Sequence, residues 1–274
     1  RHRGRLVGHR ACADKVHIGG VSGRVGPVQP FPQHGGIRAA AQGWTVRFRA
    51  GLDVGEHVVP GECDLRPRRT DVGAGCAGFV NGVQTAASLL VSQGWRRALV
   101  VTSDQFSRFL KPGSRGHALV GDGAGAAVLE RGDPGGLGLR DSVLISYADA
   151  ADACALRRPQ DWFVSSEGTG ELAVESTVTA ARTLLERNDL KISDVDRVVV
   201  HPASRLVLTR VREELGVHPD RYVTNFAHRG HTAAATIPTT LSEHLEDGTL
   251  RRGELVLAAA AGVGWYGGAL LLHL

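Results

Sequence analysis

Apolar residues recur at helical spacing in the segment that follows residue 77. Positions i, i+4, i+7, i+8 and i+11 share one face of a helix, and here they are Phe79, Val83, Ala86, Ala87 and Leu90. Gly94 is the expected C-terminal stop of this helix. A continuous apolar run at residues 98–101 is typical of a strand that is buried on both faces of a parallel sheet. The pattern therefore predicts a helix followed by a buried strand.

The alternation of helices and strands continues in the second half of the chain. Helical spacing predicts helices at about residues 171–187 and 204–215. Apolar runs predict strands at 197–200 and 222–223, and residues 131–170 are predicted to connect the two halves. Strands that alternate with helices of this length favour a mostly parallel sheet covered by helices.

One strand–helix–strand unit occurs twice in the chain. It runs over 20 residues from Cys76 to Arg96, and again over 20 residues from His231 to Arg251. Each copy ends in a Gly-rich segment that leads into an apolar strand. A duplicated α/β half that carries a thiol in one copy and an imidazole in the other predicts an active site at the junction of the halves.

Residues 1–70 show neither a period of 2 nor a period of 3.6. The chain starts at Arg1 and contains no methionine, so we expect residues 1–70 to be an irregular or non-native N-terminal segment. Out-of-frame translation of GC-rich coding sequence is one hypothesis for the amino-acid sequence of this segment. Residues 71–165 are then expected to form an incomplete N-terminal half, and residues 166–274 the C-terminal half.

The composition is that of an ordinary globular protein, with 42% hydrophobic and 22% charged residues. The longest apolar run, at 255–263, is too short to span a bilayer, and the cysteines form no CxxC pair. These features predict a cytoplasmic protein without a membrane segment. The net charge of +4 comes from residues 1–70, which carry +7. Their arginines lack helical phasing and interleaved aromatic residues, which argues against nucleic-acid binding.

Cys76 is the candidate nucleophile. It lies between Gly75 and Ala77, where the chain enters a helix. The unpaired N–H groups of a helix start favour thiolate, so a lowered pKa is expected for this thiol. The alternative interpretation is a buried structural cysteine.

Two histidines and one glycine complete the candidate site. His201 ends an apolar strand, where ligands of open α/β sheets gather, and His231 takes the position of Cys76 in the second copy. A backbone N–H at Gly262 could act as an oxyanion donor beside the N–H of Cys76. His228 and His231 lie three residues apart without an evident third ligand, so we expect no metal site.

Residues 71–130 and 171–274 resemble the β-ketoacyl-acyl carrier protein synthase III branch of the thiolase-fold condensing enzymes. The motifs that carry the resemblance are DVGAGCAGF at 71–79, GDGAGA at 121–126, HPAS at 201–204, GHTAAATIP at 230–238 and the Gly-rich last strand. The resemblance implies an α/β, thiolase-like fold of two pseudo-symmetric halves. Their sheets are expected to be mixed and mostly parallel, in a layered α-β-α-β-α arrangement.

The resemblance also implies a function. An acyl group from acyl-CoA or an acyl carrier protein is expected on Cys76, followed by decarboxylative condensation with a malonyl-type extender and no further cofactor. It implies catalytic roles for His201 and the Gly262 backbone, and a homodimer. His231 stands where the family usually has asparagine, and a histidine can also act as a base. Acyl transfer to an alcohol or amine is therefore an alternative function.

Two other interpretations remain open. One is an α/β-hydrolase with a cysteine elbow, although Ala74 replaces the first glycine of that motif and the duplication is not expected there. The other is a truncated or inactive homologue, because residues 1–70 do not resemble the first strands and helices of the family.

Overall fold

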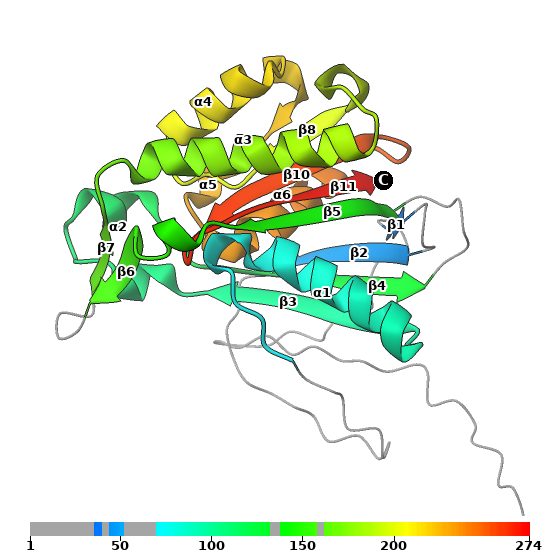
Figure 1. The fold of residues 1–274 in the computed structure, drawn as a ribbon, viewed down its shortest axis with the longest axis horizontal. Helices are drawn as coiled ribbons and strands as arrows, with labels where there is room; N and C mark the ends of the chain where they lie inside the picture. Colours follow the sequence, from blue (N-terminus) through cyan, green and yellow to red (C-terminus); the bar gives the residue numbers. More distant parts are fainter. Residues whose placement is uncertain (1–35, 40–43, 52–69, 132–137, 158–161) are drawn as a thin grey trace, which may run out of the picture.

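Two β-sheets with helices between them form the centre of the structure (Figure 1). This computed structural model describes residues 36–39, 44–51, 70–131, 138–157 and 162–274. None of the helices in these ranges has the length and apolar character needed to cross a membrane.

The N-terminal sheet is antiparallel throughout its described strands. In spatial order these strands are β1 (Gly36–Ala39), β2 (Trp44–Gly51), β4 (Gly123–Arg131) and β3 (Arg97–Asp104). Both β1 and β2 lie in the segment that was expected to be irregular, so that expectation is wrong for residues 36–39 and 44–51. The remainder of the expected segment up to residue 69 lies outside the described residues.

The C-terminal sheet is mixed. Its strands, in spatial order, are β5 (Gly138–Ser146), β11 (Tyr266–His273), β10 (Leu255–Gly262), β8 (Arg197–Val200) and β9 (Tyr222–Val223). The β10–β8 and β8–β9 pairs are parallel, whereas β5–β11 and β10–β11 are antiparallel. The expected mostly parallel sheets are therefore wrong for the described strands. Short turns such as residues 263–265 can join only antiparallel strands.

Two strands of the connection between the halves form a separate hairpin, β6 (Cys154–Arg157) with β7 (Trp162–Ser165). In contrast, β5 of the same connection pairs with β11, so the C-terminal sheet recruits a strand from before the expected boundary at residue 165.

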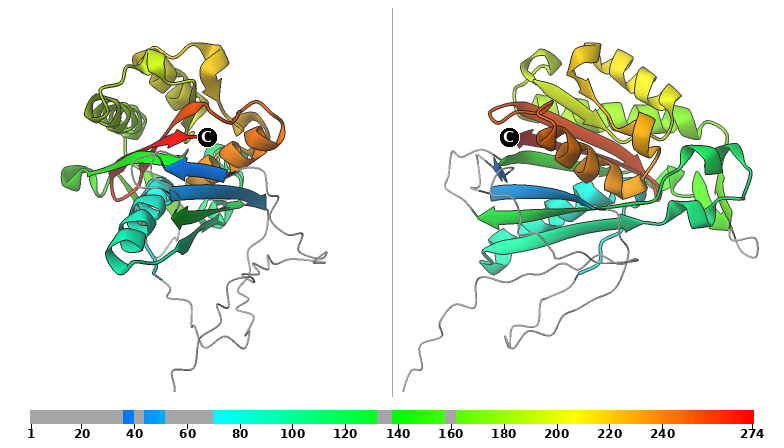
Figure 2. Two further views of the ribbon diagram at one scale, coloured as in Figure 1. Left: turned by 90° about the vertical axis from the view of Figure 1, so that its right-hand side faces the viewer. Right: turned by 180° about the vertical axis from the view of Figure 1, so that it is seen from behind.

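Four long helices define the layers. Helices α1 (Gly78–Gln93) and α6 (Thr236–Glu246) contact both sheets and lie between them, while α3 (Thr169–Arg187) packs on the other face of the C-terminal sheet, with α4 (Arg205–Leu215) against it. Figure 2 shows this order of layers from two further sides. On the outer face of β3, Leu99 and Val101 are exposed, and the described residues place no helix there. The described part thus contains an α-β-α-β arrangement without the last expected α layer.

Alternating residues of the central strands bury both faces of the C-terminal sheet. Val199 and Val256 belong to the core shared with α1 and α6, whereas Val198 and Leu257 belong to the core under α3 and α4. This period of two explains why the strands read as continuous apolar runs.

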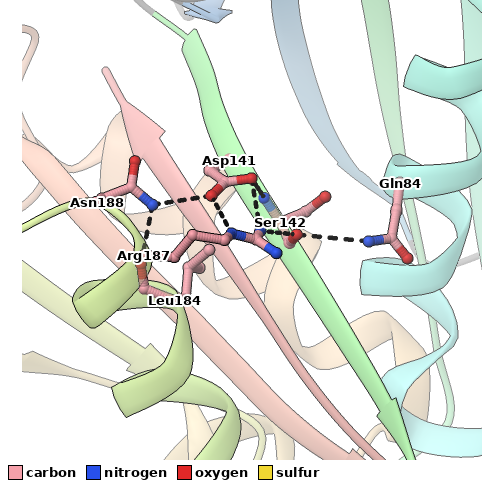
Figure 3. Close-up of polar contacts among 6 residues, drawn as sticks. All are labelled: Gln84, Asp141, Ser142, Leu184, Arg187 and Asn188. Carbon is pink, nitrogen blue, oxygen red and sulfur yellow. Dashed lines mark hydrogen bonds and ion pairs between the residues drawn. The ribbon is translucent and has the colours of Figure 1, made fainter.

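A polar network on one side of the molecule connects the layers (Figure 3). Arg187 of α3 donates to both carboxylate oxygens of Asp141 in β5, at 2.8 and 2.6 Å. Asn188 donates to the same carboxylate at 2.8 Å, and Gln84 of α1 donates to the Ser142 carbonyl at 3.4 Å. These contacts fix β5 between a helix of each half.

Candidate active site

Three side chains from distant parts of the sequence meet at the junction of the halves. The Sγ atom of Cys76 lies 3.9 Å from Nε2 of His231. The ring centroids of His231 and His201 are 4.6 Å apart, with an interplanar angle of 85°. One ligand atom from each of the three residues lies within 4.8 Å of the other two. The structure therefore brings together the thiol and both imidazoles of the sequence analysis.

A glycine-dependent turn holds Cys76. The cysteine lies in a short 3-10 helix, η1 (Gly75–Ala77), which leads directly into α1. Gly75 has a φ of +50°, and a Cβ atom there would lie 2.5 Å from the Val263 side chain. Both the left-handed backbone and this close approach require glycine at the position before Cys76.

Gly262, the last residue of β10, lies against the same turn. A Cβ atom at Gly262 would lie 2.6 Å from the Ala77 nitrogen and closer still to the Ala74 carbonyl. The backbone of Gly262 is therefore next to Cys76, where the sequence analysis expected an oxyanion donor. The backbone nitrogen of Val263 also approaches, lying 2.7 Å from the place of a Gly75 Cβ.

Backbone contacts orient His231. Its N–H donates to the Leu119 carbonyl at 2.9 Å, and its carbonyl accepts from the Gly121 N–H at 3.0 Å. The ring Nδ1 accepts a hydrogen bond of 3.2 Å from the Ala233 N–H. In a neutral imidazole only one nitrogen is an acceptor, so the ring proton is on Nε2. His231 thus presents an N–H donor toward Cys76.

Hydroxyl groups at the start of α6 support His201. Its backbone N–H extends the β8–β10 pairing by donating to the Ala259 carbonyl at 2.9 Å. Its Nδ1 atom lies 3.1 Å from Oγ1 of Thr236, which in turn lies 3.0 Å from Oγ1 of Thr232. This buried chain fixes the plane of the His201 ring.

Burial decides the protonation of the site. It raises the pKa of Cys76 to about 12, with a further contribution from the charge of Asp104. The expected lowering of this pKa is therefore wrong, because the loss of solvation outweighs the favourable charge of a helix start. Burial also lowers the pKa of His231 to about 4 and, together with the nearby His231 ring, holds that of His201 well below its usual range. At neutral pH the site holds a thiol and two neutral imidazoles.

Other residues around the site were not anticipated from the sequence. Phe106 stacks at 5.3 Å from the His231 ring and at 5.0 Å from the Phe163 ring, measured between centroids. Phe106 lies in a mainly polar segment without a counterpart in the second copy, so no repeat pointed to it. Asp104 ends β3 as Gly262 ends β10, and comparison of the two copies could have identified it.

The protonation pattern also bears on metal binding. Cys76, His201 and His231 could surround one ion by distance alone. However, a metal requires a thiolate and a free imidazole lone pair. A lone pair on Nε2 of His231 would place the ring proton on Nδ1 and break the hydrogen bond from Ala233. The donor set as folded does not favour a metal.

Two family models match the chain. A model described as 3-oxoacyl-[acyl-carrier-protein (ACP)] synthase III matches residues 70–148, and the model of the C terminal part of the same synthase matches residues 185–274. The first range includes Cys76, and the second includes both histidines and Gly262.

Similar proteins agree with the family models. β-Ketoacyl-[acyl-carrier-protein] synthase III 3 from Streptomyces coelicolor is 34% identical over 220 residues, with 74% of this chain and 65% of the relative covered. The crystal structure of 3-oxoacyl-(acyl carrier protein) synthase III from Pseudomonas aeruginosa PAO1 has a TM-score of 0.69 at 32% identity, with coverage of 74% and 65%. The priming β-ketosynthase of the R1128 polyketide biosynthetic pathway has a TM-score of 0.65 at 27% identity, with the same coverage.

The chain spans about 65% of the length of the curated relatives that it matches. Within that part, the family models, the curated relatives and the solved structures point to the same family and fold. The chain belongs to the β-ketoacyl-acyl carrier protein synthase III family of thiolase-fold condensing enzymes.

Proposed function

We propose that this chain carries the active site of a β-ketoacyl synthase III-like condensing enzyme. A thioester-bound starter acylates Cys76, and a malonyl-type extender then joins it by decarboxylative Claisen condensation. The observation that carries the proposal is the distance of 3.9 Å between Nε2 of His231 and the Cys76 sulfur. Because Nδ1 accepts the Ala233 N–H, we assign the ring proton to Nε2.

Acylation begins with attack of the Cys76 sulfur on the starter thioester. The new S–C bond forms as the starter's own thiol leaves, and the Cys76 proton passes to that leaving thiolate. The backbone N–H groups of Cys76 and Gly262 are proposed to stabilise the oxyanion, because Gly262 packs against the turn that carries Cys76. This first step conserves the thioester and requires no cofactor.

Condensation then uses the two imidazoles as donors. Hydrogen bonds from His231 and His201 to the extender's thioester oxygen stabilise the enolate that forms as carbon dioxide departs. The enolate carbon attacks the acyl carbonyl on Cys76, and the cysteine sulfur leaves and regains a proton. Neutral rings suit this task, since burial keeps both pKa values low.

The tautomer of His231 favours condensation over acyl transfer to an alcohol or amine. Such a transfer needs a base to accept the proton of the incoming nucleophile. For His231 to accept it at Nε2, the ring proton would have to move to Nδ1, opposite the Ala233 N–H. Two donors would then face each other, which is unfavourable.

The proposed substrates are acyl-CoA or an acyl carrier protein thioester, as the names of the matched families imply. We also propose a homodimer in the cytoplasm, and light scattering of the purified protein tests the dimer.

Intact-mass analysis after incubation with acetyl-CoA tests the acylation step. An acetyl mass is expected on the wild type and on a Cys154→Ser variant, in which Cys76 is the one cysteine left among the described residues. The mass is expected to be absent from a Cys76→Ala variant. Release of carbon dioxide from a malonyl thioester then separates condensation from simple transfer. A folded protein without any adduct would identify an inactive homologue.

A further inference from the structure

We propose that Asp104 is a positioning residue that directs the His231 ring by holding the start of the following helix. Asp104 lies in the N-terminal half, whereas His231 and α6 belong to the C-terminal half. The kinetic part of this inference rests on the proposed function, because it concerns the donor role of His231 in condensation. Its structural part concerns the tautomer alone.

The Asp104 carboxylate acts as an N-cap from another element. Its Oδ2 atom accepts a 3.1 Å hydrogen bond from the Ala234 N–H. Ala234 lies in η6 (Ala233–Ala235), the short 3-10 helix that leads into α6. Neither η6 nor α6 has a side-chain cap of its own or an acidic residue in its first turn. The carboxylate fills a place that the local sequence leaves empty.

The connection to His231 passes through Ala233. This residue directly precedes Ala234, whose N–H Asp104 holds, and its own N–H reaches Nδ1 of His231 at 3.2 Å. Ala233 has a φ of +47°, which a residue with a Cβ adopts only when its surroundings fix it. By holding the next N–H group, Asp104 stabilises this backbone, and the backbone in turn keeps the ring proton on Nε2.

The second copy of the unit supports the assignment. Asp104 is the last residue of β3, and Gly262 is the last residue of β10, the strand that follows α6. Asp104 presents a carboxylate to the helix start beside His231. Gly262 presents no side chain to the helix start beside Cys76, where a Cβ atom would lie 2.6 Å from the Ala77 nitrogen. A carboxylate thus caps one helix start, while the backbone of Gly262 packs directly against the other.

The test compares Asp104→Ala and Asp104→Asn with the wild type, and Asp196→Asn serves as the matched control. Asp196 also accepts a backbone N–H across elements, from Leu255 at 2.7 Å, but contacts none of the three site residues. The first readout is the tautomer of His231, measured by ¹H–¹⁵N NMR in the protein without substrate. We expect proton occupancy of Nε2 in the wild type and the control, and a shift toward Nδ1 in Asp104→Ala. Asp104→Asn retains one acceptor oxygen and is expected to shift partly.

The second readout separates the two chemical steps. Condensation is expected to fall by about tenfold or more in Asp104→Ala, as for other residues that orient a functional histidine, while acylation of Cys76 changes much less. An unchanged tautomer in a folded Asp104→Ala variant would overturn the proposal, as would an equal loss in both steps. If Asp104→Ala does not fold, an unchanged tautomer in Asp104→Asn decides against it. An inactive wild type would reject the proposed function and leave the NMR test intact.

Discussion

The Nε2 atom of His231 lies 3.9 Å from the Sγ atom of Cys76, while its Nδ1 atom accepts the Ala233 N–H. The ring thus turns a donor, rather than a lone pair, toward the nucleophile. An asparagine amide at the same position could also donate one N–H group. The imidazole of this chain and the asparagine usual in the family are therefore equivalent in the respect that condensation requires.

This equivalence predicts the outcome of replacing His231. We expect His231→Asn to keep decarboxylation of a malonyl thioester within about tenfold of the wild type, and His231→Ala to lose about 10²–10³-fold, the usual effect of removing an oxyanion donor. Carbon dioxide release measures the difference. Both variants should still be acylated on Cys76, as seen by intact mass. Equal loss in the two variants would show that the imidazole does something that an amide cannot do.

The low pKa of His231 predicts sensitivity of the fold to acid. Burial lowers this pKa from 6.5 to about 4. Because the pKa of His231 is lower in the folded state, the unfolded chain binds the proton first as the pH falls. The contribution to the free energy of unfolding is therefore fully present above pH 6.5 and is lost as the pH falls through about 4. The loss amounts to about 3 kcal/mol.

The measurement is the free energy of unfolding of the wild type and of His231→Asn between pH 7 and pH 4. The amide does not titrate, so the variant should lose less stability than the wild type over this range. Parallel curves for the two proteins would contradict the prediction.

Much of the fold could be predicted from periodicity. The helix with Phe79 and Leu90 on one face forms as α1 and ends at Gly94, which adopts the expected left-handed conformation. The run at 197–200 forms β8 with these bounds. Such segments can be recognised because burial of one helix face, or of both faces of a strand, leaves a regular pattern of apolar residues. Strand β5, the partner of β11, was missed because its burial alternates irregularly and Gly, Asp and Pro surround it.

The meeting of Cys76, His201 and His231 followed from the duplication, but their protonation did not. A helix start lowers the pKa of an exposed thiol, whereas burial of Cys76 raises it to about 12, and burial depends on side chains from both halves. The contacts of Asp104 with Ala234 and of Phe106 with His231 likewise join residues of different halves. No local pattern in a sequence reports such contacts.

The hydroxyl of Thr236 predicts a specific role in orienting His201. Thr236→Val removes the partner of Nδ1, which lies at 3.1 Å, and keeps the shape of the side chain. Because an unpartnered buried nitrogen allows the ring to turn, we expect condensation to fall by about 10-fold to 100-fold. Thr236→Ser restores the hydroxyl and should retain activity within a few-fold. The rate of malonyl decarboxylation is measured for the wild type and both variants. Similar losses of rate in Thr236→Val and Thr236→Ser would show that packing, rather than the hydroxyl group, causes the effect.

The close approach of Gly262 to the cysteine turn predicts that even one methyl group is harmful there. In Gly262→Ala the added Cβ would lie 2.6 Å from the Ala77 nitrogen, so the turn that carries Cys76 must move. Overpacking of this kind costs about 1–3 kcal/mol, and the displaced sulfur should be acylated much more slowly. Gly73→Ala is the matched control, because a Cβ at Gly73 meets no atom within 4 Å. Thermal unfolding and the rate of acetyl-CoA labelling measure the two effects, and a Gly262→Ala variant that resembles Gly73→Ala in both would place Gly262 away from the nucleophile.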